Sequence, residues 1–346
     1  MSALFSGISD FFGLDIGTTA IRLVQLKATS GSKALVKYAY VPIDSKISIS
    51  DSKSDQQKLA QTIVQLVKQA HVTTNNVAVG IPSSRVFTTM ADIDRLASHE
   101  LARAIPYQAD SLIPTALADS KIDWALLGDS PADKTKQEVL LTSVTNKFVE
   151  DRLDMLEVIG LNVIAFEPDN MALARALSAP GASVQLIVDI GHRSTDIVIV
   201  MNDAPRLMRS VPTGVEAIIR AATQNLNIDE KQAKQFVFKF GLSKDKLEGQ
   251  VYEAIINTID LLNTEIEKSL KFFSTRYNGA KVEHLIVTGG ASVIPEFPLY
   301  LANKFAINVE IGNSWRNVSY SQDRQNELLA VSNQFGVAVG LAERAE

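Results

Sequence analysis

The stretch FGLDIGTTAIRLVQL, residues 12–26, decides the fold. An apolar approach ends at Asp15, Gly17 interrupts it, and an apolar/polar alternation of period two resumes after Thr19, which predicts a β-hairpin with a polar tip. Gly17 lets the backbone come close to a phosphate, Thr18 and Thr19 offer hydroxyl and N–H donors, and Asp15 can hold a hydrated Mg²⁺ ion. Asp and Gly are also common in ordinary turns, so one such hairpin does not establish a phosphate site.

The same pattern occurs a second time, about half the chain length further on. The stretch LIVDIGHRSTDIVIV, residues 186–200, places Asp189 and Gly191 where the first stretch has Asp15 and Gly17, and Ser194 and Thr195 follow. Self-similarity over this distance predicts two related lobes, each with its own phosphate hairpin. Two such tips facing each other would bind one polyphosphate and its metal from both sides.

A third candidate element lies near the C-terminal end. An apolar strand over residues 282–287 runs directly into Thr288-Gly289-Gly290, and a helix is expected over residues 296–305. A strand–Gly-Gly–helix junction brings backbone N–H groups and a helix N-terminus to a ligand, which suits the sugar or α-phosphate side of a nucleotide. Glycine pairs can also serve only to end a strand.

Composition excludes several classes of protein. The chain has 346 residues, a formal net charge of −5, 46% hydrophobic residues and no cysteine. The negative charge argues against binding nucleic acid, and the absence of cysteine rules out disulfides and thiolate metal sites. The four histidines show no ligand spacing, and no apolar run approaches the roughly 18 residues of a membrane span. Residues 1–12 are expected to be a short surface lead-in and not a signal peptide.

Local patterns give coarse expectations for the elements between the motifs. A polar segment over residues 43–56 is expected to be a surface loop, followed by an amphipathic helix over 57–71. A helical stretch is expected over residues 218–240, and a closing helix over 334–346.

In this order, the two hairpins and the Gly-Gly junction, with an alanine-rich helix over residues 171–177 between the lobes, resemble the actin/sugar-kinase/Hsp70 ATPase superfamily. More narrowly, the chain resembles the PilM family of type IV pilus assembly proteins over nearly its whole length. The segments that carry this resemblance are Gly13–Gly17, Val79–Phe87, Ile105–Tyr107, Glu138–Leu141, Ala172–Ala176, Val188–Gly191 and Gly336–Glu343.

The resemblance implies an α/β, actin-like ATPase fold of two duplicated RNase H-like lobes, with an α+β insertion in the first lobe of the kind that the cell-division protein FtsA also has. The boundaries that follow are residues 11–82 and 161–183 for the first lobe, 83–160 for the insertion, 184–215 and 281–346 for the second lobe, and 216–280 for a helical subdomain. The C-terminal helix is expected to return towards the first lobe.

The same resemblance implies ATP and Mg²⁺ as ligands and the N-terminal cytoplasmic tail of the membrane protein PilN as partner. The assembly ATPase, other inner-membrane pilus components and further copies of the chain are additional candidate partners. It implies a cytoplasmic location at the inner face of the cytoplasmic membrane, held there through partners.

Matching the family motifs residue by residue implies three groups of nucleotide contacts, with Asp15 and Asp189 holding Mg²⁺ through water. The groups are Asp15, Gly17, Thr18 and Thr19 for the first phosphate motif; Asp189, Gly191, Ser194 and Thr195 for the second; and Gly289 and Gly290 for the adenosine motif.

Three further places in the sequence, close to these motifs, bear on nucleotide binding or turnover. Glu167 stands where Hsp70-like members place a residue that positions the attacking water, although an acid at a helix start is also favoured by the helix dipole. Gly214 stands in Thr213-Gly214-Val215, where the family usually has Gly-Gly, so this approach to the phosphates is expected to differ. His192 and Arg193 replace smaller residues and are either phosphate contacts or surface positions.

Three functions remain open on the sequence. The first is a nucleotide-dependent scaffold with slow or incidental turnover that binds an extended peptide on the first lobe and its insertion. The second is a small-molecule kinase or ATPase, for which Glu167 or Asp196 would be the general base. The third is an FtsA-like protein that forms filaments.

Overall fold

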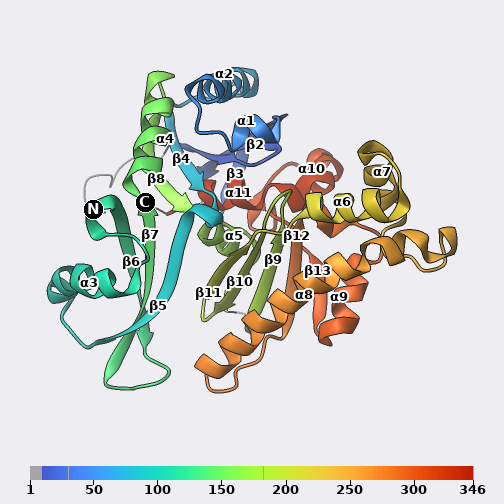
Figure 1. Ribbon diagram of the computed structural model, residues 1–346. Helices are drawn as coiled ribbons and strands as arrows, with labels where there is room; N and C mark the ends of the chain where they lie inside the picture. Colours follow the sequence, from blue (N-terminus) through green and yellow to red (C-terminus); the bar gives the residue numbers. More distant parts are fainter. Residues whose placement is uncertain (1–9, 30, 182, 346) are drawn as a thin grey trace. The chain divides into compact units, whose positions relative to one another are not determined.

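Figure 1 shows the computed structural model, which describes residues 10–29, 31–181 and 183–345. The expected lead-in, residues 1–12, lies largely outside the described residues. The chain forms two compact units. The first comprises Met1–Ala176, Ser314–Ala330 and Phe335–Glu346, and the second comprises Leu177–Asn313 and Val331–Gln334. Residues 314–330 and 335–346, which we assigned to the second lobe, are therefore grouped with the first unit.

The first unit is built on a six-stranded sheet in the order β14-β3-β2-β1-β4-β8. The predicted hairpin is present as the antiparallel pair β1 and β2, in which Asp15 lies opposite Arg22. Strands β4 and β8 continue the sheet in parallel. The bounds are β1 Phe12–Ile16, β2 Ala20–Ala28, β3 Lys33–Pro42, β4 Asn76–Ile81, β8 Asn162–Pro168 and β14 Val318–Ser319.

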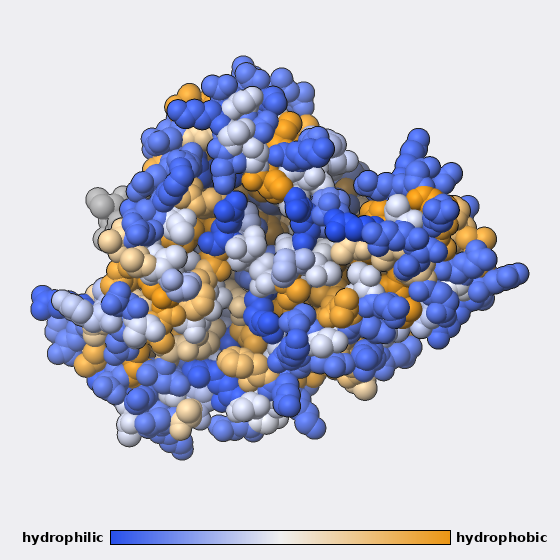
Figure 2. All heavy atoms as spheres, viewed as in Figure 1, coloured by the Kyte–Doolittle hydropathy of each residue, from blue (hydrophilic) through white to orange (hydrophobic). Residues whose placement is uncertain are grey.

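Helices cover both faces of this sheet. Leu59, Ile63 and Leu66 of α2 are buried in one hydrophobic core with Phe12 and Leu14 of β1, and the outer side of α2 is mainly hydrophilic (Figure 2). Helix α11 packs against β1, β2 and β4. The helices that lie mainly in this unit are α1 Ser45–Ser48, α2 Lys53–Ala70, α3 Ser98–Leu112, α4 Asn146–Val158, α5 Asp169–Leu177, α10 Gln325–Val331 and α11 Gly336–Ala342.

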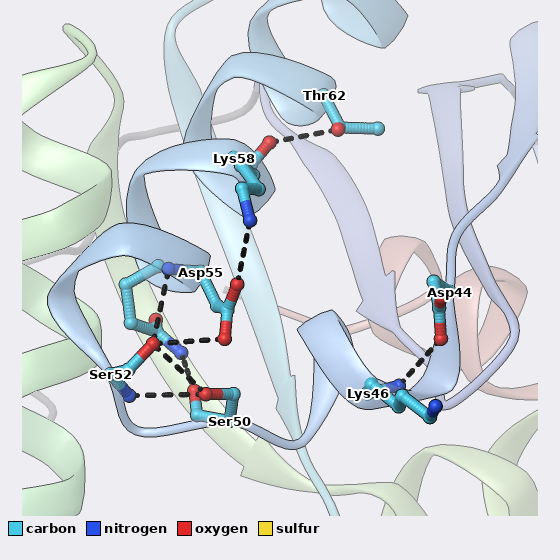
Figure 3. Close-up of polar contacts among 8 residues, drawn as sticks. Asp44, Lys46, Ser50, Ser52, Asp55, Lys58 and Thr62 are labelled. Carbon is cyan, nitrogen blue, oxygen red and sulfur yellow. Dashed lines mark hydrogen bonds and ion pairs between the residues drawn. The ribbon is translucent and has the colours of Figure 1, made fainter.

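The segment before α2 is more ordered than the expected loop over residues 43–56. Asp44 accepts a hydrogen bond from the Lys46 N–H at 2.9 Å and starts α1, and the Ser52 hydroxyl accepts one from the Asp55 N–H at 3.3 Å and starts α2 (Figure 3). The polar residues that suggested a loop are helix caps, so α2 begins four residues before the predicted start.

The insertion in the first unit is a separate antiparallel sheet in the order β5-β7-β6. Helix α3 packs on one face of it through Leu101 and Ile105, which share a core with Val139 and Leu141 of β7. The bounds of the strands are β5 Val86–Asp94, β6 Ser120–Asp129 and β7 Lys136–Thr145.

The second unit repeats the hairpin arrangement in a five-stranded sheet of order β11-β10-β9-β12-β13. Strands β9 and β10 form the second predicted hairpin, and β12 lies parallel to β9. The bounds are β9 Gln185–Ile190, β10 Thr195–Met201, β11 Ala204–Val211, β12 His284–Gly289, β13 Asn308–Ile311, α6 Val215–Leu226, α7 Glu230–Phe240, α8 Gln250–Arg276 and α9 Phe297–Phe305.

Two predicted helices differ from the structure. The stretch over residues 218–240 is divided into α6 and α7, because Asn227 adopts a left-handed conformation with φ 51° and Asp229 caps the next helix. The closing helix extends only over Gly336–Ala342. Among the described residues, no helix is both long enough and apolar enough to cross a bilayer.

Candidate functional site

The tip of the first hairpin presents backbone donors. The Gly17 N–H donates to the Ala20 carbonyl at 3.1 Å and closes the turn, while the Ser48 hydroxyl donates to the Gly17 carbonyl at 2.8 Å. Within the described residues, the N–H groups of Thr18 and Thr19 make no hydrogen bond. Because adjacent free N–H groups in a turn favour an anion, this tip fits a phosphate group.

Asp15 lies below this tip and is 6% exposed. Its Oδ2 atom lies 3.2 Å from Nη1 of Arg22, the residue opposite it in the hairpin. Burial raises the pKa of Asp15, and the neighbouring Arg22 opposes that rise. Our sequence analysis missed Arg22, although its position opposite Asp15 follows from the length of the predicted turn.

The tip of the second hairpin has the same turn, closed by the Gly191 N–H and the Ser194 carbonyl at 2.9 Å. The Thr195 side chain is buried and its hydroxyl donates to the Thr213 carbonyl at 2.7 Å, so it holds the backbone together. Asp189 lies opposite Asp196 in the register of β9 and β10.

The two hairpins therefore differ in charge. Asp15 of the first is opposite a cation, Arg22, whereas Asp189 of the second is opposite another acid, Asp196. Paired carboxylates suit a hydrated divalent cation, and an arginine suits phosphate oxygens. No group of three or more acidic or histidine side chains that could hold a metal ion is found among the described residues.

Gly214 brings the start of α6 against the second hairpin. The Val215 and Glu216 N–H groups donate to the carbonyls of Gly191 and His192 at 3.0 and 2.9 Å. A Cβ atom on Gly214 would lie 2.6 Å from both of these carbonyl oxygens. Only glycine fits at this close approach of α6 to the second hairpin, where the first N–H groups of α6 donate to the hairpin backbone.

Burial lowers the pKa of His192, so its imidazole is neutral at pH 7.

The Gly-Gly turn follows β12, as predicted. Gly289 has φ 78°, and a Cβ atom there would overlap Oδ1 of Asp189, so a side chain at this position is excluded on two grounds. The helix that we expected over residues 296–305 is present as α9, Phe297–Phe305. A 3-10 turn over Gly290–Val293 lies between Gly289 and this helix.

Asn333, which is 5% exposed, is a residue that the sequence analysis missed. Its Nδ2 donates to the Gly289 carbonyl at 3.0 Å and to the Ser292 hydroxyl at 2.8 Å, and its carbonyl accepts from the Thr288 hydroxyl at 2.9 Å. These bonds fix the turn in the shape that presents Gly289 beside Asp189.

Glu167, at the end of β8, is 4% exposed and is bound by two arginines. Arg175 donates to both carboxylate oxygens, and Nη1 of Arg344 donates to Oε2 at 2.9 Å. A base would have to leave these partners before it could accept a proton. The geometry favours a structural ion pair, and the catalytic assignment of Glu167 stays a prediction.

Glu343, beside this cluster, gives a prediction about pH. Burial raises its pKa to about 7, with Arg175 and Lys33 opposing the rise. The folded state therefore keeps a proton that the unfolded state loses above its ordinary pKa near 4.5, so this group makes stability fall as the pH rises between these two values. From pH 5 to pH 8, the wild-type chain should lose about 2 kcal/mol of unfolding free energy relative to Glu343→Gln.

Urea unfolding of both proteins, followed by fluorescence of the two tryptophans, Trp124 and Trp315, measures this difference, since both lie in the first unit. Glu157→Gln, an exposed position on α4, is the control and should show no relative change with pH. If the unfolding free energies of the wild type and Glu343→Gln change with pH in parallel, the folded state does not hold this proton.

Two sheets, each opened by an acid–glycine hairpin and extended by parallel strands, define the actin-like ATPase fold, and solved structures confirm it. A chain in the structure of the PilM-PilN type IV pilus biogenesis complex is 24% identical in sequence to this chain. The match covers 96% of this chain and 97% of the other, with a TM-score of 0.81. The ethanolamine utilization protein EutJ from Carboxydothermus hydrogenoformans is 14% identical over 96% and 88%, with a TM-score of 0.57. MreB5 of Spiroplasma citri bound to ADP is 14% identical over 96% and 95%, with a TM-score of 0.56.

The family model for the type IV pilus assembly protein PilM matches residues 13–346. The chain therefore belongs to this family and is an actin-like protein of type IV pilus biogenesis. The resemblance and the fold class predicted from the sequence are both confirmed.

Proposed function

We propose that this protein is a nucleotide-dependent scaffold that binds Mg-ATP and the N-terminal cytoplasmic tail of PilN. Its place would be at the cytoplasmic face of the inner membrane, held there by its partners. The observation that carries the nucleotide part is the pair of free N–H groups of Thr18 and Thr19 at a turn whose twin recurs at Gly191. The structure of MreB5 bound to ADP supports a nucleotide as the ligand class.

Each hairpin would have a distinct task. The N–H groups of Thr18 and Thr19 and the guanidinium of Arg22 would bind phosphate oxygens, while Asp189 and Asp196 would orient the water shell of Mg²⁺. Asp15 keeps one oxygen outside its ion pair with Arg22 and would add a further water contact. When bound, Mg²⁺ neutralises phosphate charge. The Gly289–Gly290 turn, fixed by Asn333, would contact the nucleoside side.

The arrangement of these residues fits a scaffold with slow ATP turnover better than it fits a small-molecule kinase. A kinase needs a general base that faces its acceptor. Glu167 is bound by two arginines, which leaves it poorly suited to that task, and we assign Asp196, the other candidate base, to the water shell of Mg²⁺. Nucleotide binding would then serve to bias a conformation that favours the peptide.

Isothermal titration with a short PilN tail peptide tests the proposal. We expect saturable binding that is about tenfold tighter with Mg-ATP than without nucleotide. A peptide of the same composition in scrambled order is the control and should not bind. Absence of binding in both nucleotide states would exclude the PilN assignment, and equal affinity in both states would exclude its dependence on nucleotide.

A further inference from the structure

Arg152 on α4 is a half-buried cation whose side chain makes no hydrogen bond or ion pair within the described residues. Its Nη1 atom is fully buried and makes no hydrogen bond, and no ion pair reaches its side chain from the described residues. Burial lowers its pKa to about 10, so it is still charged at pH 7. A buried guanidinium that lacks a counter-charge is costly, and such groups are normally paired.

A second arginine lies beside it. Arg85 ends the 3-10 turn Ser83–Arg85, and the guanidinium carbons of Arg85 and Arg152 both lie 5.6 Å from the centroid of the Phe148 ring. The negative charge of Asp51 opposes the lowering of the Arg152 pKa, and the repulsion between the two cations, a smaller effect, adds to it. The same turn contains Ser83, whose buried hydroxyl has no hydrogen-bond partner in the described part of the chain.

Asp51 forms an ion pair with Arg85 but not with Arg152. Its Oδ2 lies 3.8 Å from Nη2 of Arg85, and its side chain is 75% exposed. No hydrogen bond or ion pair joins it to Arg152. The residues on both sides of it, Ser50 and Ser52, are held by hydrogen bonds at the start of α2 (Figure 3), which restricts the backbone that carries Asp51.

Two further charged residues of α4 are paired with each other. Lys147, one turn before Arg152 on α4, pairs with Asp151 at 2.6 Å. The cluster of Arg85, Phe148 and Arg152 therefore keeps a surplus of positive charge around a buried donor.

We propose that Arg85 and Arg152, held by Phe148, form a binding site for a single oxyanion, either a phosphate or a carboxylate group. Planar guanidinium groups bind such oxygens by two parallel hydrogen bonds, and the aromatic ring holds the cations without using their donors. The site is separate from the hairpin tips. The 3-10 turn links β4 to β5, and α4 links β7 to β8, so an anion here contacts the insertion and the main sheet of the first unit together.

Thermal unfolding in different anions tests the site, with tryptophan fluorescence as the readout for the first unit. At constant ionic strength, replacing chloride by 50 mM phosphate or 50 mM acetate should raise the Tm of the wild type more than that of Arg152→Met, by about 2 °C. The anion with the larger difference identifies the ligand class. Arg103→Met, at an exposed position of α3, should respond as the wild type does. Equal responses of wild type and Arg152→Met to both anions overturn the proposal.

A double-mutant cycle in chloride separates this site from an internal ion pair. Because Arg152 lacks a partner in the free protein, Arg152→Met should leave the Tm unchanged or raise it, and its effect should be the same in an Asp51→Asn background. Destabilisation by Arg152→Met that disappears in the Asp51→Asn background would mean that Asp51 is the true partner and would overturn the proposal. Neither test involves Mg-ATP or PilN, so failure here leaves the proposed function untouched.

Discussion

Gly340→Ala is expected to lower the unfolding free energy of the first unit by about 3 kcal/mol or more. Gly340 is in the middle of α11, and a Cβ atom there would overlap the carbonyl oxygen and Cα atom of Ala172. Both obstacles are backbone atoms of α5, so neither can move by changing a rotamer. At an exposed helical site the same change would stabilise the helix by about 1 kcal/mol. The sign of the change in unfolding free energy therefore shows whether α11 packs against the backbone of α5.

Urea unfolding followed by tryptophan fluorescence measures this change. Ala102→Val, which adds bulk at an exposed position of α3, is the control and should alter the unfolding free energy by less than about 1 kcal/mol. A Gly340→Ala variant as stable as the wild type would show that α11 does not pack against α5 at backbone contact.

Asp15→Asn is expected to weaken Mg-ATP binding at least about a hundredfold, equivalent to about 2.7 kcal/mol. The amide keeps the shape of the side chain but removes the charge that would hold metal-bound water and balance Arg22. In EDTA the same change should leave ATP affinity unchanged or raise it, because without metal the carboxylate only repels the phosphates. This dependence on metal separates a metal contact from a general loss of structure.

Titration calorimetry of ATP, with Mg²⁺ and with EDTA, gives both affinities. Asp110→Asn, an exposed acid on α3, is the control and should bind as the wild type does. Near-ultraviolet circular dichroism checks that the variant is folded. If Asp15→Asn binds Mg-ATP with wild-type affinity, Asp15 takes no part in the site.

Local patterns were sufficient for the elements that build the fold. Alternation of period two around Asp15 and Asp189 predicted both hairpins from local pattern alone, although the structure buries nearly every residue of β1, β9 and β10. The Gly-Gly turn after β12 was predicted from an equally local pattern, two glycines directly after an apolar strand. These three elements suggested the superfamily, and further segments along the chain suggested the PilM family, which the match over residues 13–346 confirms.

Contacts between residues distant in sequence could not be predicted in this way. Asn333 supports Gly289 from another part of the chain, and Glu167 meets Arg344 only because α11 returns to the first sheet. The opposite charges of Arg22 and Asp196 were overlooked, although the register of each hairpin follows from the length of its turn. The cap at Ser52 was present in the sequence, but the surrounding polar residues are equally typical of a loop.

A crystal structure of the chain with a non-hydrolysable Mg-ATP analogue and a PilN tail peptide tests the central claim most directly. We predict phosphate oxygens within hydrogen-bonding distance of the Thr18 and Thr19 N–H groups, a hydrated Mg²⁺ beside Asp189, and the peptide bound to the first unit. Nucleotide absent from both hairpin tips, or peptide bound only to the second unit, would contradict the account.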